Sequence, residues 1–152
     1  MTVSISSGTA EDLPEIQRLQ CRVHGAKAWD LVSWEVELAR PNGMLWIARA
    51  DHGDPMGYLL AWRVVDRIEI VDLVVCPEHR RQGIARALVG LMKSLSIQGE
   101  LTAIGLEVRE DNKAGVALYQ ALGFSVTQEI HGFYDDGESA LRMMWPVAKS
   151  RI

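Results

Sequence analysis

The sequence has too few cysteines for a fold held together by disulfides. Cys21 and Cys76 are the only cysteines among 152 residues, and a single pair so far apart forms no disulfide pattern. Secreted domains that rely on disulfides carry more cysteines at closer spacings. We therefore expect two reduced thiols, and a cytoplasmic protein.

Long hydrophobic runs are also lacking. No stretch approaches the roughly 18 consecutive apolar residues that a membrane-spanning helix needs. The first residues, MTVSISSGTAEDLPEI, have neither a basic start nor an apolar run, so we expect no signal or transit peptide. Repeats, low-complexity tracts and linkers are missing as well. These absences predict one soluble domain over residues 1–152, without a membrane partner, at a length that can bury its own core.

Clusters of positive charge and of metal ligands are scarce. The formal net charge is −4, and the basic residues gather only at Arg80 and Arg81. This balance argues against nucleic acid as a partner and favours cationic substrates. The four histidines, none of which has the spacing of a metal site, are His24, His52, His79 and His131. We expect no metal site.

Apolar periodicity predicts the order of the elements: two helices, three strands, a helix, a strand, a helix and two strands. The second helix is expected to follow Asp30, to bury Leu31, Trp34 and Leu38, and to stop before Pro41. The other helices are expected at about 10–23, 83–98 and 112–122. The strands are expected in MLWIARA, MGYLLAWRVV, RIEIVDLVV, AIGLEV and the two segments that flank residues 135–137.

The most informative feature is the polar turn CPEHRRQG, which leads from an apolar strand directly into a helix. The first N–H groups of a helix lack internal partners, and the helix dipole adds roughly half a positive charge there, so backbone alone can hold a diphosphate. Gly83 and Ala85 permit close approach, and Arg80, Arg81 and Arg86 add positive charge. The common nucleotide motifs G-x-x-x-x-G-K-[ST] and G-x-G-x-x-G do not occur. A basic start of an ordinary helix is the alternative interpretation.

The run Arg80-Arg81-Gln82-Gly83-Ile84-Ala85 matches [QR]-x-x-G-x-[GA], the acetyl-CoA motif of the GNAT superfamily of N-acetyltransferases, which the sequence therefore resembles. The segments LEVREDNKA and ALYQALGF continue the resemblance at the spacing of that superfamily. The resemblance covers nearly the whole chain. It implies an α/β (α+β) fold with a mixed, mostly antiparallel, seven-stranded splayed sheet and about four helices, and acetyl-CoA as cosubstrate.

The resemblance also implies which residues bind acetyl-CoA. The fourth strand, at about 68–76, would splay from the fifth, at about 104–108, and receive the pantetheine arm. The implied cofactor contacts are Leu73, Val74, Val75, Arg80, Arg81, Gln82, Gly83, Ile84, Ala85, Arg86, Asn112 and Tyr119. Asn112 is also a typical helix N-cap, and that plainer role remains open.

Two residues are implied to carry the chemistry. Tyr119 lies seven residues after Asn112, hence on the same helical face, where it would protonate the departing thiolate; the alternative is a packed aromatic ring. Glu107 is the candidate general base. Strand alternation places it on the face opposite Leu106 and Val108, so a merely solvated carboxylate is the alternative.

Rival bases lie on the preceding strand, where many members of the superfamily carry theirs. The candidates there are Glu69 and Asp72.

Several acceptors remain open. LEVR, ALY and the hairpin HGFYDDG most resemble the branch that acetylates ribosomal-protein N-terminal alanines (RimI), which implies a protein N-terminus as partner, with Trp29 and Tyr134 binding it. The usual Phe-Pro-Trp order of that branch is absent, and Phe133 stands where a tyrosine is usual. A lysine side chain, a small amine such as a polyamine or antibiotic, and an acyl-CoA-binding module without turnover are the alternatives. We expect a monomer or homodimer.

Overall fold

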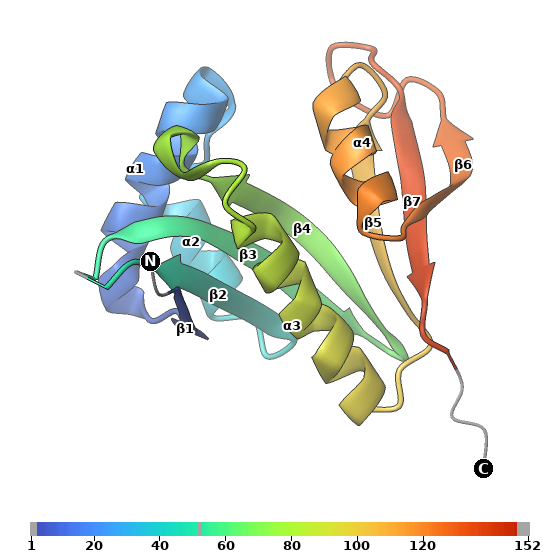
Figure 1. Cartoon of the computed structure of the whole chain (residues 1–152). Coiled ribbons are helices and arrows are strands. Elements are labelled where there is room, and N and C mark those ends of the chain that lie inside the picture. Colours follow the sequence, from blue (N-terminus) through green and yellow to red (C-terminus); the bar gives the residue numbers. More distant parts are fainter. Residues whose placement is uncertain (1–2, 52, 149–152) are drawn as a thin grey trace. The chain divides into compact units, whose positions relative to one another are not determined.

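The described part of the chain, residues 3–51 and 53–148 of a computed structural model, contains a seven-stranded mixed sheet with strand order β1-β2-β3-β4-β5-β7-β6 (Figure 1). The strands are β1 (Ser4–Ser7), β2 (Gly43–Arg49), β3 (Pro55–Val64), β4 (Arg67–Val75), β5 (Ala103–Arg109), β6 (Ser125–Ile130) and β7 (Ala140–Pro146). The α-helices are α1 (Leu13–His24), α2 (Leu31–Leu38), α3 (Ile84–Gln98) and α4 (Lys113–Ala121). The predicted order of helices and strands is confirmed, except that β1 was missed.

The pattern of apolar residues did not predict strand β1, because the strand is short and polar. Its four residues, SISS, include one apolar side chain, and most of the strand is exposed. It nevertheless pairs antiparallel with β2, from Ser4↔Arg49 to Ser7↔Trp46. Its hydrogen bonds to β2, rather than an apolar face, therefore define it as a strand.

The chain divides into two compact units. Unit 1 comprises Met1–Arg63 and Val71–Leu91, and unit 2 comprises Val64–Ile70 and Met92–Ile152. Strand β4 and helix α3 each contribute residues to both units. That residues 1–152 form a single domain stays a prediction.

In unit 1, α1 and α2 pack on the sheet. Trp34 of α2 and Tyr58 of β3 are both fully buried, with ring centroids 5.3 Å apart. The apolar cluster around them consists of Leu13, Ile16, Leu19, Trp34, Leu45, Ile47, Tyr58, Leu60, Val74 and Cys76. Leu31, predicted to be buried, is 40% exposed. It is the first residue of α2, next to the cap residue Asp30, so it lies at the open end of the helix.

In unit 2, β5 pairs along its whole length with β7, antiparallel, from Ala103↔Pro146 to Arg109↔Ala140. The first residues of β4 pair with β5 in parallel, from Arg67↔Ala103 to Ile70↔Leu106. Strand β6 completes this part of the sheet by pairing with β7, and α4 lies beside β5 and β7 (Figure 1).

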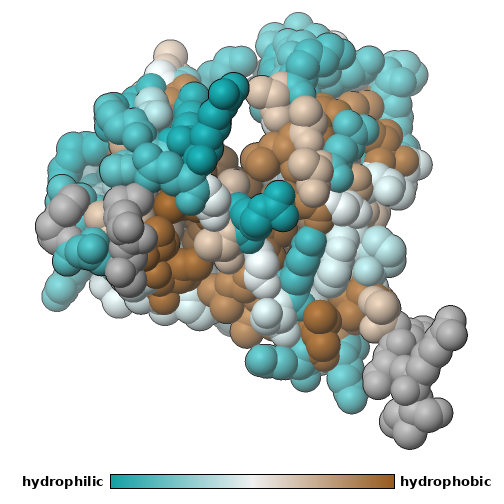
Figure 2. Space-filling model, in the orientation of Figure 1, coloured by the Kyte–Doolittle hydropathy of each residue, from teal (hydrophilic) through white to brown (hydrophobic). Residues whose placement is uncertain are grey.

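The face of the molecule shown in Figure 2 mixes hydrophilic and hydrophobic residues. None of the helices in the described residues is long and apolar enough to cross a membrane. Both cysteines are free thiols: Cys21 is exposed and Cys76 is buried.

Candidate active site

The turn that follows β4 in unit 1 ends in an open helix N-terminus. A short 3₁₀ helix, Pro77–His79, leads into the polar turn, and α3 begins at Ile84. The N–H of Ala87 is bonded to the carbonyl of Gly83 at 2.9 Å, so by helix geometry the N–H groups before it have no partner inside the helix. Gly83 has a φ of 79°, and a Cβ added there would meet no atom within 4 Å. Conformation rather than space therefore requires glycine at this position.

The basic side chains of this turn are available to an anion. Arg80, Arg81 and Arg86 are all exposed, and Arg80 Nε donates to the carbonyl of Val75 at 3.4 Å. Three guanidinium groups beside an open helix N-terminus suit a diphosphate. The predicted contacts in the preceding strand are less exposed: Val74 is 2% exposed, and Leu73 and Val75 are partly buried.

The buried thiol of Cys76 has polar partners. Its Sγ donates to Glu78 Oε2 at 2.6 Å and accepts from Arg22 Nη1 at 3.2 Å. Hydrogen bonds from Arg22 and from Cys76 lower the pKa of Glu78 to about 2. A pocket of about 220 Å³ beside α1, which includes none of the predicted site residues, is lined by Glu15, Arg18, Leu19, Arg22, Pro55 and Cys76. Cys76 is therefore a buried free thiol, in agreement with the predicted reduced cysteines.

Trp29, a predicted substrate-binding residue, is held by α1. Its N–H donates to Gln20 Oε1 at 2.8 Å, and its carbonyl accepts from Gln17 Nε2 at 3.4 Å. Gln20 is 2% exposed, and the same oxygen accepts the indole N–H of Trp34 at 3.0 Å. The segment between α1 and α2 is thereby tied to α1 through one buried amide.

Asp72, one of the two rival bases on β4, is held by three side chains. Its Oδ2 accepts from the hydroxyl of Tyr58 at 2.6 Å and from Gln20 Nε2 at 3.0 Å. Its Oδ1 lies 3.4 Å from His24 Nε2. The hydrogen bond to Asp72 raises the pKa of His24, although burial opposes this. Burial, together with the charge of Asp72, raises the pKa of Tyr58 as well.

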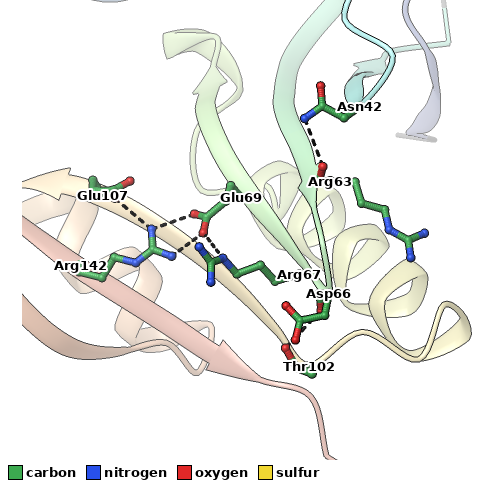
Figure 3. A network of polar contacts seen from close by, with 8 residues as sticks. All are labelled: Asn42, Arg63, Asp66, Arg67, Glu69, Thr102, Glu107 and Arg142. Carbon is green, nitrogen blue, oxygen red and sulfur yellow. Dashed lines mark hydrogen bonds and ion pairs between the residues drawn. The ribbon is translucent and has the colours of Figure 1, made fainter.

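Glu107, the candidate base in unit 2, lies on the face that strand alternation predicts. Leu106 and Val108 are 1% and 7% exposed, whereas the Glu107 side chain is 34% exposed. Its Oε1 accepts from Arg142 Nη1 at 3.0 Å (Figure 3). The carboxylate therefore faces outward but is ion-paired.

Glu69, the other rival base, is more fully engaged than Glu107. Arg142 donates to both of its oxygens, and Arg67 Nε donates to Oε1 at 2.6 Å (Figure 3). Burial alone would raise the pKa of Glu69, but the hydrogen bonds and charges of Arg142 and Arg67 outweigh it and lower that pKa. A carboxylate held at both oxygens by guanidinium groups is a poor proton acceptor.

Helix α4 carries the two predicted residues that follow β5. Asn112 Oδ1 accepts the N–H of Gly115 at 2.9 Å, so the N-cap role is confirmed. Tyr119 is partly buried, and its ring meets Phe124 in a T-shaped contact with centroids 5.7 Å apart. Cofactor contacts by Asn112 and Tyr119 stay predictions.

Tyr134 lies in the hairpin between β6 and β7, next to charged groups. The guanidinium of Arg109 stands 4.7 Å from its ring centroid, and Arg109 Nη2 donates to Asp136 at 2.6 Å. Burial raises the pKa of Tyr134, and Glu107 is among the charged groups that contribute to the shift. The structure thus brings Tyr134 and Glu107 into one electrostatic environment within unit 2.

Residues 10–124 match the model of the Acetyltransferase (GNAT) family. The chain belongs to the GNAT family. The match covers more than half of the chain and includes the motif at 80–85, Glu107 and Tyr119.

Relatives of known activity extend the family assignment. The chain is 30% identical over 151 residues to the [ribosomal protein bS18]-alanine N-acetyltransferase of Escherichia coli K12, covering 95% of this chain and 98% of that one. Over 85 residues it is 38% identical to an N-alpha-acetyltransferase of Saccharolobus solfataricus, covering 55% of this chain and 51% of the relative. The crystal structure of the Escherichia coli ribosomal-protein-S18-alanine N-acetyltransferase superposes with a TM-score of 0.87 at 25% identity, covering 99% and 97% of the two chains.

These findings confirm the predicted GNAT fold and enzyme class: the protein is an acetyl-CoA-dependent N-acetyltransferase. Nourseothricin acetyltransferase, with a TM-score of 0.80 at 22% identity over 97% of this chain and all of that one, shares the fold alone. In the described residues no three side chains of His, Cys, Asp or Glu gather as a metal site. His52 lies outside the described residues.

Sequence reasoning missed two side chains that hold the predicted site residues: Arg142 beside Glu107, and Gln20 beside Trp29 and Asp72. A signal for Gln20 was present, because it is a polar residue within the apolar stripe of α1. Arg142 had no comparable signal, since its partner depends on the register of β5 and β7.

Proposed function

We propose that this N-acetyltransferase acetylates the N-terminal α-amine of a protein, with a ribosomal protein as the leading candidate. The observation that carries the proposal is the 30% identity to the bS18-alanine N-acetyltransferase over nearly the full length of both chains. The shared fold over 99% of this chain supports it. Such a substrate places the enzyme in the cytoplasm, where ribosomal proteins are made.

The turn after β4 is proposed to bind acetyl-CoA through its diphosphate. The open N-terminus of α3, the left-handed Gly83 and the exposed Arg80, Arg81 and Arg86 support this assignment. Gln82, Ile84 and Ala85 would contribute backbone N–H groups. The backbone of Leu73, Val74 and Val75 is assigned to the pantetheine arm.

The chemistry is proposed as direct attack of the amine on the thioester. The nitrogen forms a bond to the acetyl carbon, the C–S bond breaks, Glu107 takes a proton from the amine, and Tyr119 gives one to the leaving thiolate. An N-terminal ammonium has a pKa near ~7.7 and a lysine near ~10.4, so a carboxylate base suits an N-terminus better. Asn112 would hold the coenzyme beside Tyr119.

The acceptor is proposed to contact Trp29 and Tyr134. Each ring is partly buried and is carried by a segment that joins larger elements, and an aromatic ring suits contact with a peptide. Spermidine N-acetyltransferase from Vibrio cholerae has a TM-score of 0.80 but 17% identity, over 95% of this chain and 93% of that one, which shows the shared fold alone. It therefore does not favour a polyamine as the acceptor here.

The test follows release of free thiol from acetyl-CoA with three acceptors in parallel. These are a peptide with a free N-terminal alanine, the same peptide blocked at its N-terminus but containing lysine, and spermidine. We expect turnover with the free N-terminus alone. Turnover with the blocked peptide or spermidine, and none with the free N-terminus, would disprove the acceptor assignment while leaving the acetyltransferase chemistry intact.

A further inference from the structure

Arg142 stands directly across the ladder from the candidate base. In the antiparallel pairing of β5 and β7 the Cα partner of Glu107 is Arg142. Opposite charges at such a pair of positions attract, and the Arg142 side chain is 15% exposed. The bond from Nη1 to Glu107 Oε1 is 3.0 Å long.

The same guanidinium extends across β5 to a second carboxylate, Glu69 on β4 (Figure 3). The residue of β5 that pairs with Glu69 is Gly105. A Cβ added at Gly105 would lie 2.5 Å from Arg142 Nη2 and 3.0 Å from its Cζ. The missing side chain at position 105 therefore leaves the room that Arg142 needs to reach Glu69.

The two carboxylates are held differently. Arg142 engages Glu69 through both oxygens and Glu107 through one, Oε1. A guanidinium has five N–H donors in a fixed planar arrangement, so it can hold two carboxylates at once in a defined geometry. Glu69 acts as an anchor that orients the guanidinium, whereas Glu107 keeps a second oxygen that is not used by Arg142.

We propose that Arg142 is a positioning residue for the general base: anchored on Glu69 through the gap at Gly105, it orients the Glu107 carboxylate. This inference rests on the proposed role of Glu107 in acetyl transfer. It does not depend on which amine is the acceptor.

The effect on activity follows from what the Arg142 guanidinium holds. Among the described residues it is the cation bonded to Glu107, and it is bonded to Glu69 as well. Removing it leaves the Glu107 carboxylate without the partner that orients it, so we expect the acetyl-transfer step itself to slow.

The first measurement is the steady-state kinetics of thiol release, using whichever amine of the acceptor panel turns over. For Arg142→Met we expect kcat to fall by about tenfold with KM for acetyl-CoA little changed, because the base is still present but no longer oriented. The matched control is Arg67→Gln, which removes a guanidinium from Glu69 but not from Glu107, and we expect its kcat to stay close to that of the wild type.

A double-mutant cycle separates positioning from a general effect on the fold. Glu107→Gln is expected to lower kcat/KM by about a hundredfold or more. If Arg142 acts through Glu107, then Arg142→Met in the Glu107→Gln background produces little further loss. An Arg142→Met effect of the same size in both backgrounds would overturn the proposal, as would a wild-type kcat in Arg142→Met.

Gly105→Ala tests the same idea without changing any charge, in case Arg142→Met does not fold. The added methyl group would meet the ends of two flexible side chains, Arg142 Nη2 at 2.5 Å and Met144 Sδ at 2.9 Å, and no backbone atom lies among its nearest neighbours. We expect kcat to fall, as for Arg142→Met. A wild-type kcat in folded Gly105→Ala would also contradict the proposal. Failure of the acceptor assignment is distinguishable, because it appears as the identity of the amine that turns over.

Discussion

At the scale of single residues, release of the thiol is proposed to depend on the hydroxyl of Tyr119. Tyr119→Phe removes this hydroxyl but keeps the ring that meets Phe124. Since a thiol with a pKa near ~8.5 is a fair leaving group, we expect kcat to fall by about tenfold and both KM values to change little. Steady-state kinetics of thiol release measure this.

Phe124→Leu is the control for the ring contact. It removes the partner ring and leaves the hydroxyl of Tyr119 in place, so we expect a lower melting temperature with kcat little changed. Wild-type kcat in Tyr119→Phe would assign the proton donor to another group.

At the scale of elements, Gln20 decides how the segment between α1 and α2 is held. Its amide accepts from the Trp29 N–H and the Trp34 indole and donates to Asp72. Gln20→Leu leaves these buried groups without their partner, at a cost of about 1–3 kcal/mol for each unsatisfied group. We expect the melting temperature to fall and KM for the acceptor peptide to rise several-fold, with KM for acetyl-CoA unchanged.

The matched variant for this prediction is Gln17→Leu. Gln17 also contacts Trp29, but through one longer bond of 3.4 Å at a position that is only partly buried, so a smaller effect on stability and on acceptor KM is expected. Equal increases of both KM values in Gln20→Leu would show that the amide does not act on the acceptor side selectively.

At the scale of the whole molecule, several pKa shifts predict how stability depends on pH. The pKa values of Glu69, Glu78 and Asp30 are lowered by folding. Their contribution is present above the unfolded carboxyl pKa and is lost as pH falls; for Glu78 the loss runs from 4.5 to about 2. The hydrogen bond with Glu129 raises the pKa of Glu110, so this residue favours the folded state more at low pH than at neutral pH. Glu69 is expected to contribute most, because Glu78 and Asp30 are exposed and solvent screens their interactions, and the midpoint of thermal unfolding should decline below about pH 4.5.

His24 adds a second, weaker dependence on the alkaline side. Its pKa is raised above 6.5 by Asp72, so its contribution is complete below pH 6.5 and is lost as pH rises through the folded value. His24→Gln is expected to remove this decline and leave the acid limb unchanged. A wild-type midpoint that stays flat above pH 6.5 would contradict the assigned His24–Asp72 pair.

The sequence by itself determined the features that depend on neighbouring residues. Apolar periodicity predicted the helices and most strands. Asn112 was recognised as a helix N-cap from its residue type and position. The alternation of apolar and polar residues around Glu107 predicted that its side chain faces outward. The acetyl-CoA motif at residues 80–85 could be recognised from the sequence because it consists of a few consecutive residues.

Only the tertiary structure decided the features that depend on distant partners. Strand β1 forms because β2 pairs with it, and its own four residues show no alternation of apolar and polar side chains that would predict a buried face. Arg142 lies beside Glu107, 35 residues away in sequence, because of the register between β5 and β7. Its side chain can extend to Glu69 because Gly105 leaves a gap. Side-chain alternation assigns a residue to a face of a strand, but the register between strands selects its partner.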